Sequence, residues 1–169
     1  KKKILILGGG YSKERSISIR SAKAIIKTID KTYKIKFCDP CHRLFKTIET
    51  FKPDVIFNAL HGRFGEDGYI QSIIEILGEK YTHSGVISSM SAMDKEISKK
   101  IFIKNKILTP KFIIFNYNLK NIDNLKITIK KKLKYPVVIK PINEGSSVDV
   151  YISDERNLKK NLIKMNKYK

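Results

Sequence analysis

His61-Gly62-Arg63-Phe64-Gly65-Glu66-Asp67-Gly68-Tyr69-Ile70-Gln71-Ser72 is the stretch of the chain that decides its fold. It follows the run 54–60, which is short, mostly apolar and partly β-branched, and which therefore predicts a buried strand. Just after Gly68, apolar residues recur at helical spacing, at Ile70, Ile73, Ile74 and Leu77. A strand, a glycine-rich polar loop and a helix in this order are typical of an open α/β sheet, whose ligands bind at the carboxyl ends of the strands. We therefore expect His61 at a ligand-binding edge.

The simplest alternative is a capped turn, in which Asp67 caps the following helix and Glu66 is solvated. A simple turn does not require a histidine, two acids and three glycines in one loop, so this combination indicates a further role. The loop resembles the signature of the D-alanine–D-alanine ligases, in which His-Gly, two residues and Gly-Glu-Asp-Gly are followed by a Gln and a small residue. Gln71 and Ser72 match that pattern.

Three more runs in the first half predict strands, at 3–7, 33–37 and 80–82. A first helix is expected to open at Ser12 or the residue after it, with Glu14 in its first turn, where the helix dipole favours a carboxylate. The inward face of this helix is expected at Ile17, Ala24, Ile25 and Ile29. The second helix is expected to turn inward Leu44, Phe45, Ile48 and Phe51. Strands that alternate with helices predict a parallel sheet with right-handed crossovers.

The turn Gly8-Gly9-Gly10 lacks the G-x-G-x-x-G spacing of a dinucleotide site, and no acid ends the second strand in the ribose position unless Asp39 serves. By itself it predicts a tight turn between a strand and a helix. Together with 12–15 and Ser18, it resembles the first loop of the ligase family. The resemblance implies that Glu14 binds the ammonium group of the first D-alanine. It also implies that this substrate is contacted by His61, Ser18 and Gly9.

The second half is expected to begin near Asp94. A helix with Ile97, Ile101, Phe102 and Ile103 is expected to end near Asn105, and a strand is predicted at 111–117. A polar turn at 118–123 then precedes a basic helix that turns Leu125, Ile129 and Leu133 inward. Strands at 136–140 and 148–152 enclose the loop 143–147. A last helix carries Leu158, Leu162 and Met165.

Lys140 lies at the end of a predicted strand and faces a Gly-Ser-Ser loop, which is an arrangement that can bind a phosphate. The alternative is a surface hairpin with an extended lysine. The segment resembles the nucleotide loop of the same ligases, whose run is Lys-Pro, two residues and Glu-Gly-Ser-Ser-Val-Gly. Asp149 replaces the last glycine, so either the loop turns this acid outward or nucleotide handling differs. The resemblance implies that ATP is bound by Lys95, Lys140, Glu144, Gly145 and Ser147, and that Ser146 acts at the catalytic centre by helping to hold Glu14.

The block from Tyr81 to Lys95 resembles the next block of the family, which usually has a glycine where His83 stands. That departure leaves the local backbone conformation open.

The chain has 169 residues, 41% of them hydrophobic, and a formal net charge of +19. Such a charge would suit a nucleic-acid or anion binder, but the basic residues are scattered over the predicted helices and no recognised nucleic-acid motif accompanies them. We therefore expect no nucleic-acid partner. No run is long and apolar enough to span a bilayer, and the first apolar stretch is too short for a signal peptide, so a cytoplasmic protein is expected.

Cys38 and Cys41 lie between a predicted strand and a helix, as in a thioredoxin-like dithiol. Nothing else in the chain resembles thioredoxin, and His42 is the only other close zinc ligand. We expect two cysteines without a chemical role.

These patterns together predict an α/β fold: an N-terminal open parallel sheet flanked by helices, of the pre-ATP-grasp type, in residues 1–93. An incomplete α+β ATP-grasp subdomain follows in residues 94–169. The resemblance implies ATP-dependent ligation of two D-alanines through an acyl phosphate, for peptidoglycan synthesis, by a homodimer. Mg²⁺ ligands are expected beyond Lys169, so no metal site is expected in this chain and residues 1–169 alone are expected to be inactive, as a fragment or a truncated product. The alternatives are a non-catalytic ligand- or partner-binding module and a ligase that joins D-alanine to D-lactate.

Overall fold

The computed structural model describes residues 1–116 and 121–168, with the backbone alone at Cys41 and His42. The chain forms two compact units, Lys1–Met93 and Asp94–Lys169. No helix among the described residues is long and apolar enough to cross a membrane.

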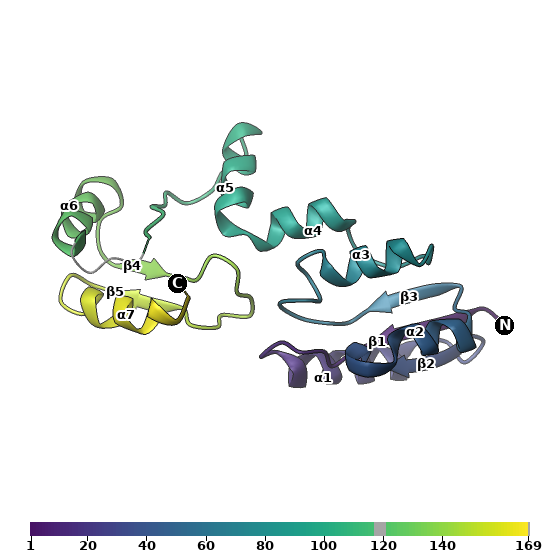
Figure 1. Ribbon diagram of the computed structural model, residues 1–169. Coiled ribbons are helices and arrows are strands. Elements are labelled where there is room, and N and C mark those ends of the chain that lie inside the picture. Colours follow the sequence, from purple (N-terminus) through teal and green to yellow (C-terminus); the bar gives the residue numbers. More distant parts are fainter. Residues whose placement is uncertain (117–120, 169) are drawn as a thin grey trace. The chain divides into compact units, whose positions relative to one another are not determined.

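The first unit is built on a parallel three-stranded sheet with the order β2-β1-β3. Its strands are β1 (Lys3–Leu7), β2 (Lys34–Cys38) and β3 (Val55–Asn58), and its helices are α1 (Arg15–Thr28), α2 (Pro40–Phe51), α3 (Tyr69–Ile76) and α4 (Val86–Met93). In register, Leu7 lies beside Cys38 on one side and Asn58 on the other, so the three strands end together (Figure 1). The predicted open parallel sheet flanked by helices is confirmed.

Alternate residues of β1 point to opposite faces of the sheet. Leu5 and Leu7 pack with apolar residues of α2 and α3, among them Ile48 and Ile74, while Ile6 packs with Ala22 of α1. The strand reads as continuously apolar because helices cover both faces. Fully burying one such side chain contributes about 1.5–3 kcal/mol, so this double-sided core fixes the position of the sheet edge.

Several details of the first unit differ from the sequence predictions. Ala24 and Phe45 are exposed, because the buried positions of their helices fall on other residues of the same helices. The predicted strand 80–82 is a single parallel bridge between Tyr81 and Ile56. Helix α1 begins at Arg15, so Glu14 stands at the N-cap position rather than in the first turn. Helix α4 was not expected from the sequence, because its serines interrupt the apolar pattern.

The second unit has an α+β composition. It contains the antiparallel pair β4 (Val137–Ile139) and β5 (Tyr151–Ser153), the helices α5 (Lys95–Lys104), α6 (Ile122–Lys132) and α7 (Leu158–Lys164), and the short helix η2 (Met165–Tyr168). Its core joins buried residues of α6 and α7, which are Ile122, Leu125, Ile129, Leu158 and Leu162.

Two predicted strands of the second unit differ from the structure, one entirely and one in where it begins. Residues 111–116 form no strand, although Ile113 and Phe115 still pack against the α6–α7 core, because an apolar pattern reports burial and not strand pairing. The strand predicted at 148–152 begins only at Tyr151, since Asp149 has a φ of +52° and cannot continue a ladder. Part of the turn predicted at 118–123 lies outside the described residues, and α6 already begins at Ile122.

Candidate functional site

The carboxyl ends of β1, β2 and β3 carry three loops of the first unit to one edge of the sheet. This is the edge at which open α/β sheets bind their ligands. The loop after β1 leads to Glu14, the residue after β2 is Asp39, and the loop after β3 contains His61. The geometry of the site follows from how these loops are tied to one another.

Glu14 is the most informative side chain at this edge. It is only 4% exposed, and its Oε1 has no hydrogen-bond partner among the described residues. Its Oε2 lies against Gly62, so close that a Cβ at that glycine would overlap the oxygen. The φ of Gly62 is +71°, which also favours glycine. A buried carboxylate with an unsatisfied oxygen is costly unless a donor, such as an ammonium group, is bound there.

Ser12 joins the loop that carries Glu14 to residues 61–68, the signature loop. Its Oγ donates to the carbonyl oxygen of His61 at 2.6 Å and accepts from the backbone N–H of Glu14 at 3.1 Å. The imidazole of His61 is fixed separately, because its Nε2 lies 3.0 Å from Oγ of Ser21 on α1. Helix α1 thus helps to position two of the side chains that the family resemblance assigns to the first substrate, Glu14 and His61.

Ser18 has a role that the sequence did not indicate. It is fully buried, and its Oγ accepts from the backbone N–H of Gly9 at 2.8 Å and donates to the carbonyl oxygen of Ala59 at 2.8 Å. Both bonds lie inside the unit, so the geometry favours a support that joins the ends of β1 and β3 over direct contact with a ligand. Gly9 has a φ of +100°.

Two buried side-chain amides hold the signature loop in place through hydrogen bonds. The carbonyl oxygen of Gly65 accepts from Nδ2 of Asn58 at 2.8 Å and from Nε2 of Gln71 at 2.9 Å. Glu66 is not merely solvated, since its Oε2 accepts from the backbone N–H of Gly62 at 2.7 Å. Asp67 accepts from the N–H of Tyr69, the first residue of α3, at 3.2 Å. Asn58 belongs to the support of this loop, and only its position at the end of a strand could have indicated it.

A pocket of about 210 Å³ opens beside the signature loop. Its walls include the glycine turn and four aromatic side chains, Tyr11, Phe45, Phe64 and Tyr69. Phe64 makes edge-to-face contacts with Tyr11 and Tyr69 at centroid distances of 6.3 and 5.2 Å. His61 also lines the pocket, and Glu14 does not. The pocket and the Glu14 carboxylate are therefore distinct features of the same edge.

In the second unit, Lys95 is brought to the predicted nucleotide loop. Its Nζ donates to the carbonyl oxygens of Ile142 at 3.1 Å and Glu144 at 2.5 Å. Burial and, after it, the nearby charge of Lys140 lower the pKa of Lys95. Asp94 caps α5, its Oδ1 accepting from the N–H of Ile97 at 2.9 Å, and so fixes the start of the helix that carries Lys95. The two cations and the acid that the family resemblance assigns to ATP thus gather around one loop, and Lys140, which precedes this loop, is exposed.

The same loop shows how Asp149 is accommodated. Its carboxylate pairs with Nζ of Lys167 at 2.8 Å and accepts from the hydroxyls of Tyr168 and Tyr151, the latter at 2.9 Å. The bonds from Lys167 and then Tyr168 hold the pKa of Asp149 well below its usual range. Ser146 and Ser147 before it also have positive φ, +43° and +62°. The acid is therefore turned toward its own cationic and hydroxyl partners.

The described residues contain no group of three or more His, Cys, Asp or Glu side chains that could hold a metal ion. Burial raises the pKa of the Cys38 thiol, which makes it a poor nucleophile near neutral pH.

Comparison with known proteins gives this edge its context. The chain is 61% identical, over 168 residues and 99% of its length, to the D-alanine–D-alanine ligase of Pelagibacter ubique, of which it covers 55%. It superposes on the crystal structure of the D-alanine–D-alanine ligase from Bacillus anthracis with a TM-score of 0.79 at 34% identity, covering 99% of this chain and 55% of that one. The complex of that enzyme with ATP gives a TM-score of 0.77 at 32% identity, covering 99% of this chain and 56% of that one. No family model matches the chain.

The chain thus spans about half the length of the relatives it matches. The resemblance to the D-alanine–D-alanine ligases that the sequence motifs indicated is confirmed over nearly the whole chain.

Proposed function

We propose that this protein is an ATP-dependent D-alanine–D-alanine ligase that acts in the synthesis of the peptidoglycan precursor. The observation that supports this best is the buried carboxylate of Glu14, with one oxygen unpartnered among the described residues, at the ligand-binding edge of the sheet. A relative that is 61% identical carries the name of that activity. We place the reaction in the cytoplasm.

Glu14 is proposed to bind the ammonium group of the first D-alanine. A charge-assisted bond would satisfy Oε1 and fix the direction of the substrate carboxylate. His61 is proposed to contact that carboxylate, and since Ser21 engages its Nε2, we assign the contact to Nδ1. Ser18 and Gly9 are proposed to support this site from inside the unit.

In the proposed reaction, a carboxylate oxygen of the first D-alanine attacks the γ-phosphorus of ATP, and ADP leaves. The amine of the second D-alanine then attacks the acyl carbon of the resulting acyl phosphate, and inorganic phosphate leaves as the peptide bond forms. Lys95 and Lys140 are proposed to neutralise phosphate oxygens, as cations do in phosphoryl transfer. Glu144, Gly145 and Ser147 are proposed to contact the nucleotide, and the catalytic role of Ser146 stays a prediction from the resemblance.

The family also implies Mg²⁺ with the nucleotide. The described side chains do not provide a ligand set for it, so we derive no step through a metal from them.

The test uses the complete gene product, whatever its length. We expect phosphate release that needs ATP, Mg²⁺ and D-alanine together, with a D-alanyl dipeptide identified by mass spectrometry. Parallel assays with D-lactate in place of the second D-alanine determine the second substrate. Binding of D-alanine and ATP without any product would refute the ligase and favour the non-catalytic binding module.

Two proposals about partners accompany this function. We propose a homodimer, on the family resemblance alone, and light scattering coupled to size exclusion measures it. We also propose that the protein binds no nucleic acid despite its net charge of +19. Tight DNA binding that falls steeply with salt would contradict this.

A further inference from the structure

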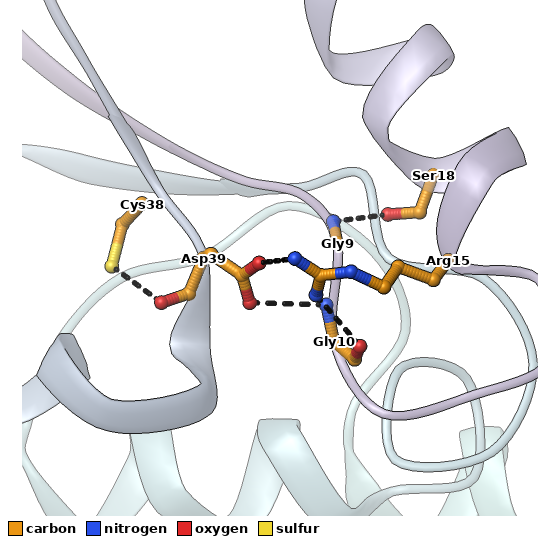
Figure 2. Close-up of polar contacts among 6 residues, drawn as sticks. All are labelled: Gly9, Gly10, Arg15, Ser18, Cys38 and Asp39. Carbon is orange, nitrogen blue, oxygen red and sulfur yellow. Dashed lines mark hydrogen bonds and ion pairs between the residues drawn. The ribbon is translucent and has the colours of Figure 1, made fainter.

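The glycine turn after β1 has backbone donors of the kind that bind anions in many α/β domains, and the chain itself uses them. The N–H of Gly9 donates to Oγ of Ser18 at 2.8 Å, and the N–H of Gly10 donates to Oδ1 of Asp39 at 3.2 Å (Figure 2). The side chain of Asp39, which follows β2, therefore stands at the turn in the place of an external anion.

Arg15 closes this arrangement into a ring. Its Nη2 pairs with Oδ2 of Asp39 at 2.5 Å, and its Nη1 donates to the carbonyl oxygen of Gly10 at 2.9 Å (Figure 2). Gly10 is thus held at its N–H by the acid and at its C=O by the base. A Cβ at Gly9 would lie 2.5 Å from Oδ2 of Asp39 and 3.0 Å from Nη1 of Arg15, so the ion pair packs directly on the turn.

These contacts engage both carboxylate oxygens of Asp39 inside the unit and so disfavour the role of a ribose-binding acid, which its place at the end of the second strand had left open. Oδ1 is engaged by Gly10 and Oδ2 by Arg15. The side chain is 27% exposed, and that of Arg15 is 48% exposed. Such a pair adds little to global stability, because solvent screens it, and its effect is expected to be local.

The order of the strands shows what the local effect is. Strand β1 lies between β2 and β3, and α1 begins directly after the turn that ends β1. Arg15 reaches from the first turn of α1 to the end of β2. Its neighbour Glu14 reaches the other way, to Gly62 after β3. Because the two residues are adjacent, a shift of the backbone at Arg15 also displaces the carboxylate of Glu14.

We propose that Arg15 and Asp39 are positioning residues, which lock the turn Gly9–Gly10 and the start of α1 so that Glu14 stays aimed at the ammonium group of the first D-alanine. The pair touches no substrate. This inference rests on the proposed function for its kinetic consequence, but the locking of the turn is measurable without catalysis.

The kinetic test compares Asp39→Asn and Arg15→Met with Asp54→Asn in the complete protein. Asp54 is a matched control, because its carboxylate also accepts a backbone N–H, that of Lys3 at 2.6 Å, at the opposite end of β1. We expect Asp39→Asn and Arg15→Met each to raise KM for the first D-alanine about tenfold and to leave kcat and KM for ATP within about twofold. The double variant should lose no more than either single one, because both remove the same pair. Arg15→Lys keeps the charge and should recover part of the loss.

A role in stability alone would lower the active fraction, and kcat would fall while both KM values stayed the same. An unchanged KM for D-alanine in Asp39→Asn and Arg15→Met would overturn the proposal, as would an equal rise in the control.

Amide hydrogen exchange separates this proposal from the proposed function. Exchange in residues 9–15 should become about tenfold faster in Asp39→Asn and Arg15→Met and stay unchanged in Asp54→Asn. If the wild-type protein formed no dipeptide, the proposed ligase activity would be refuted while this experiment still measured the lock. Unchanged exchange in the two variants would overturn the lock, whatever the activity.

Discussion

Replacing Glu14 by glutamine tests the chemistry of the site with little change in its packing. The side chain is 4% exposed, its Oε2 lies against Gly62, and its Oε1 is unpartnered among the described residues. Glutamine has the same length and can occupy the same space. It keeps one amide oxygen that can accept from an ammonium group, but it removes the negative charge. Any loss in the variant therefore measures charge rather than shape.

The expected size of the loss follows from the burial of Glu14. A hydrogen bond to a charged group contributes about 1.5–3 kcal/mol, whereas exposed ion pairs contribute only about 0.2–1 kcal/mol. The 4% exposure places Glu14 in the first class. Since about 1.36 kcal/mol corresponds to a tenfold change in rate, kcat/KM for the first D-alanine should fall by about ten- to two-hundredfold.

The assay is the initial rate of phosphate release by the complete protein, with D-alanine varied at saturating ATP and then the reverse. KM for ATP should stay within about twofold of the wild type, because the cations assigned to ATP are carried by other elements. Glu49→Gln, the same change at an exposed position of α2, is the control and should have no effect. If Glu14→Gln lost affinity for ATP and kept its dependence on D-alanine, the assignment of this loop would be wrong.

Three further predictions concern two glycines with positive φ, the thiol of Cys38 and the carboxyl group of Asp149. Gly62→Ala and Gly78→Ala place a side chain at similar φ, +71° and +69°, but only the first meets an obstacle, the Glu14 carboxylate. Gly78→Ala should therefore lower stability by about 1 kcal/mol in chemical denaturation, and Gly62→Ala should lower it further and also raise KM for D-alanine. Because burial raises the pKa of Cys38 above its ordinary 9.0, iodoacetamide should alkylate this thiol far more slowly in the native protein than in urea at pH 8 when followed by mass spectrometry; equal rates would contradict its burial. The lowered pKa of Asp149 means that its stabilisation is complete above its ordinary 3.8 and lost as the pH falls through the native value, so thermal melts below pH 4 should fall less steeply in Asp149→Gly than in the wild type.

Sequence patterns predicted the first unit well because both faces of its sheet are buried. Strands β1 and β3 are short apolar runs that end in polar loops, and helix α3 begins after Gly68 as its apolar spacing indicated. The same reasoning does not distinguish which apolar residue of a helix is inward when several are adjacent. Phe45 follows the buried Leu44 and is 61% exposed, because only one of two neighbours can face the sheet.

The predicted strand at 111–117 shows a different limit. Its apolar residues Ile113 and Phe115 do pack against a core, but a strand also needs a hydrogen-bonded partner, which hydrophobicity does not report. The side-chain interactions within the site could not be predicted from the sequence either. The sequence placed Asp39 at the end of a strand, but its pairing with Arg15 depends on the order β2-β1-β3, which places the two residues side by side at the sheet edge.

His83 and Asp149 stand where the ligase family usually has glycine, and the structure explains how both are tolerated. Each keeps a backbone that glycine would adopt, with φ of +92° at His83 and +52° at Asp149. Each side chain then finds partners of its own. His83 lies 2.9 Å from Oγ1 of Thr82 through its Nδ1 and packs edge-to-face on Phe57 at a centroid distance of 6.0 Å. The carboxylate of Asp149 is paired with Lys167.

That pairing matters for the proposed nucleotide loop, because an isolated carboxylate there would repel a triphosphate. A carboxylate 2.8 Å from an ammonium group acts at longer range as a neutral dipole, whose potential falls more steeply with distance than that of a charge. The substitution of glycine by Asp149 is therefore compatible with ATP binding as long as Lys167 stays in place. By the same argument, Lys167→Met should weaken ATP binding more in the wild-type background than in Asp149→Gly, where no charge is left to neutralise. Equal losses in the two backgrounds, measured by calorimetric titration of ATP into the complete protein, would show that Lys167 acts on the nucleotide directly and not through Asp149.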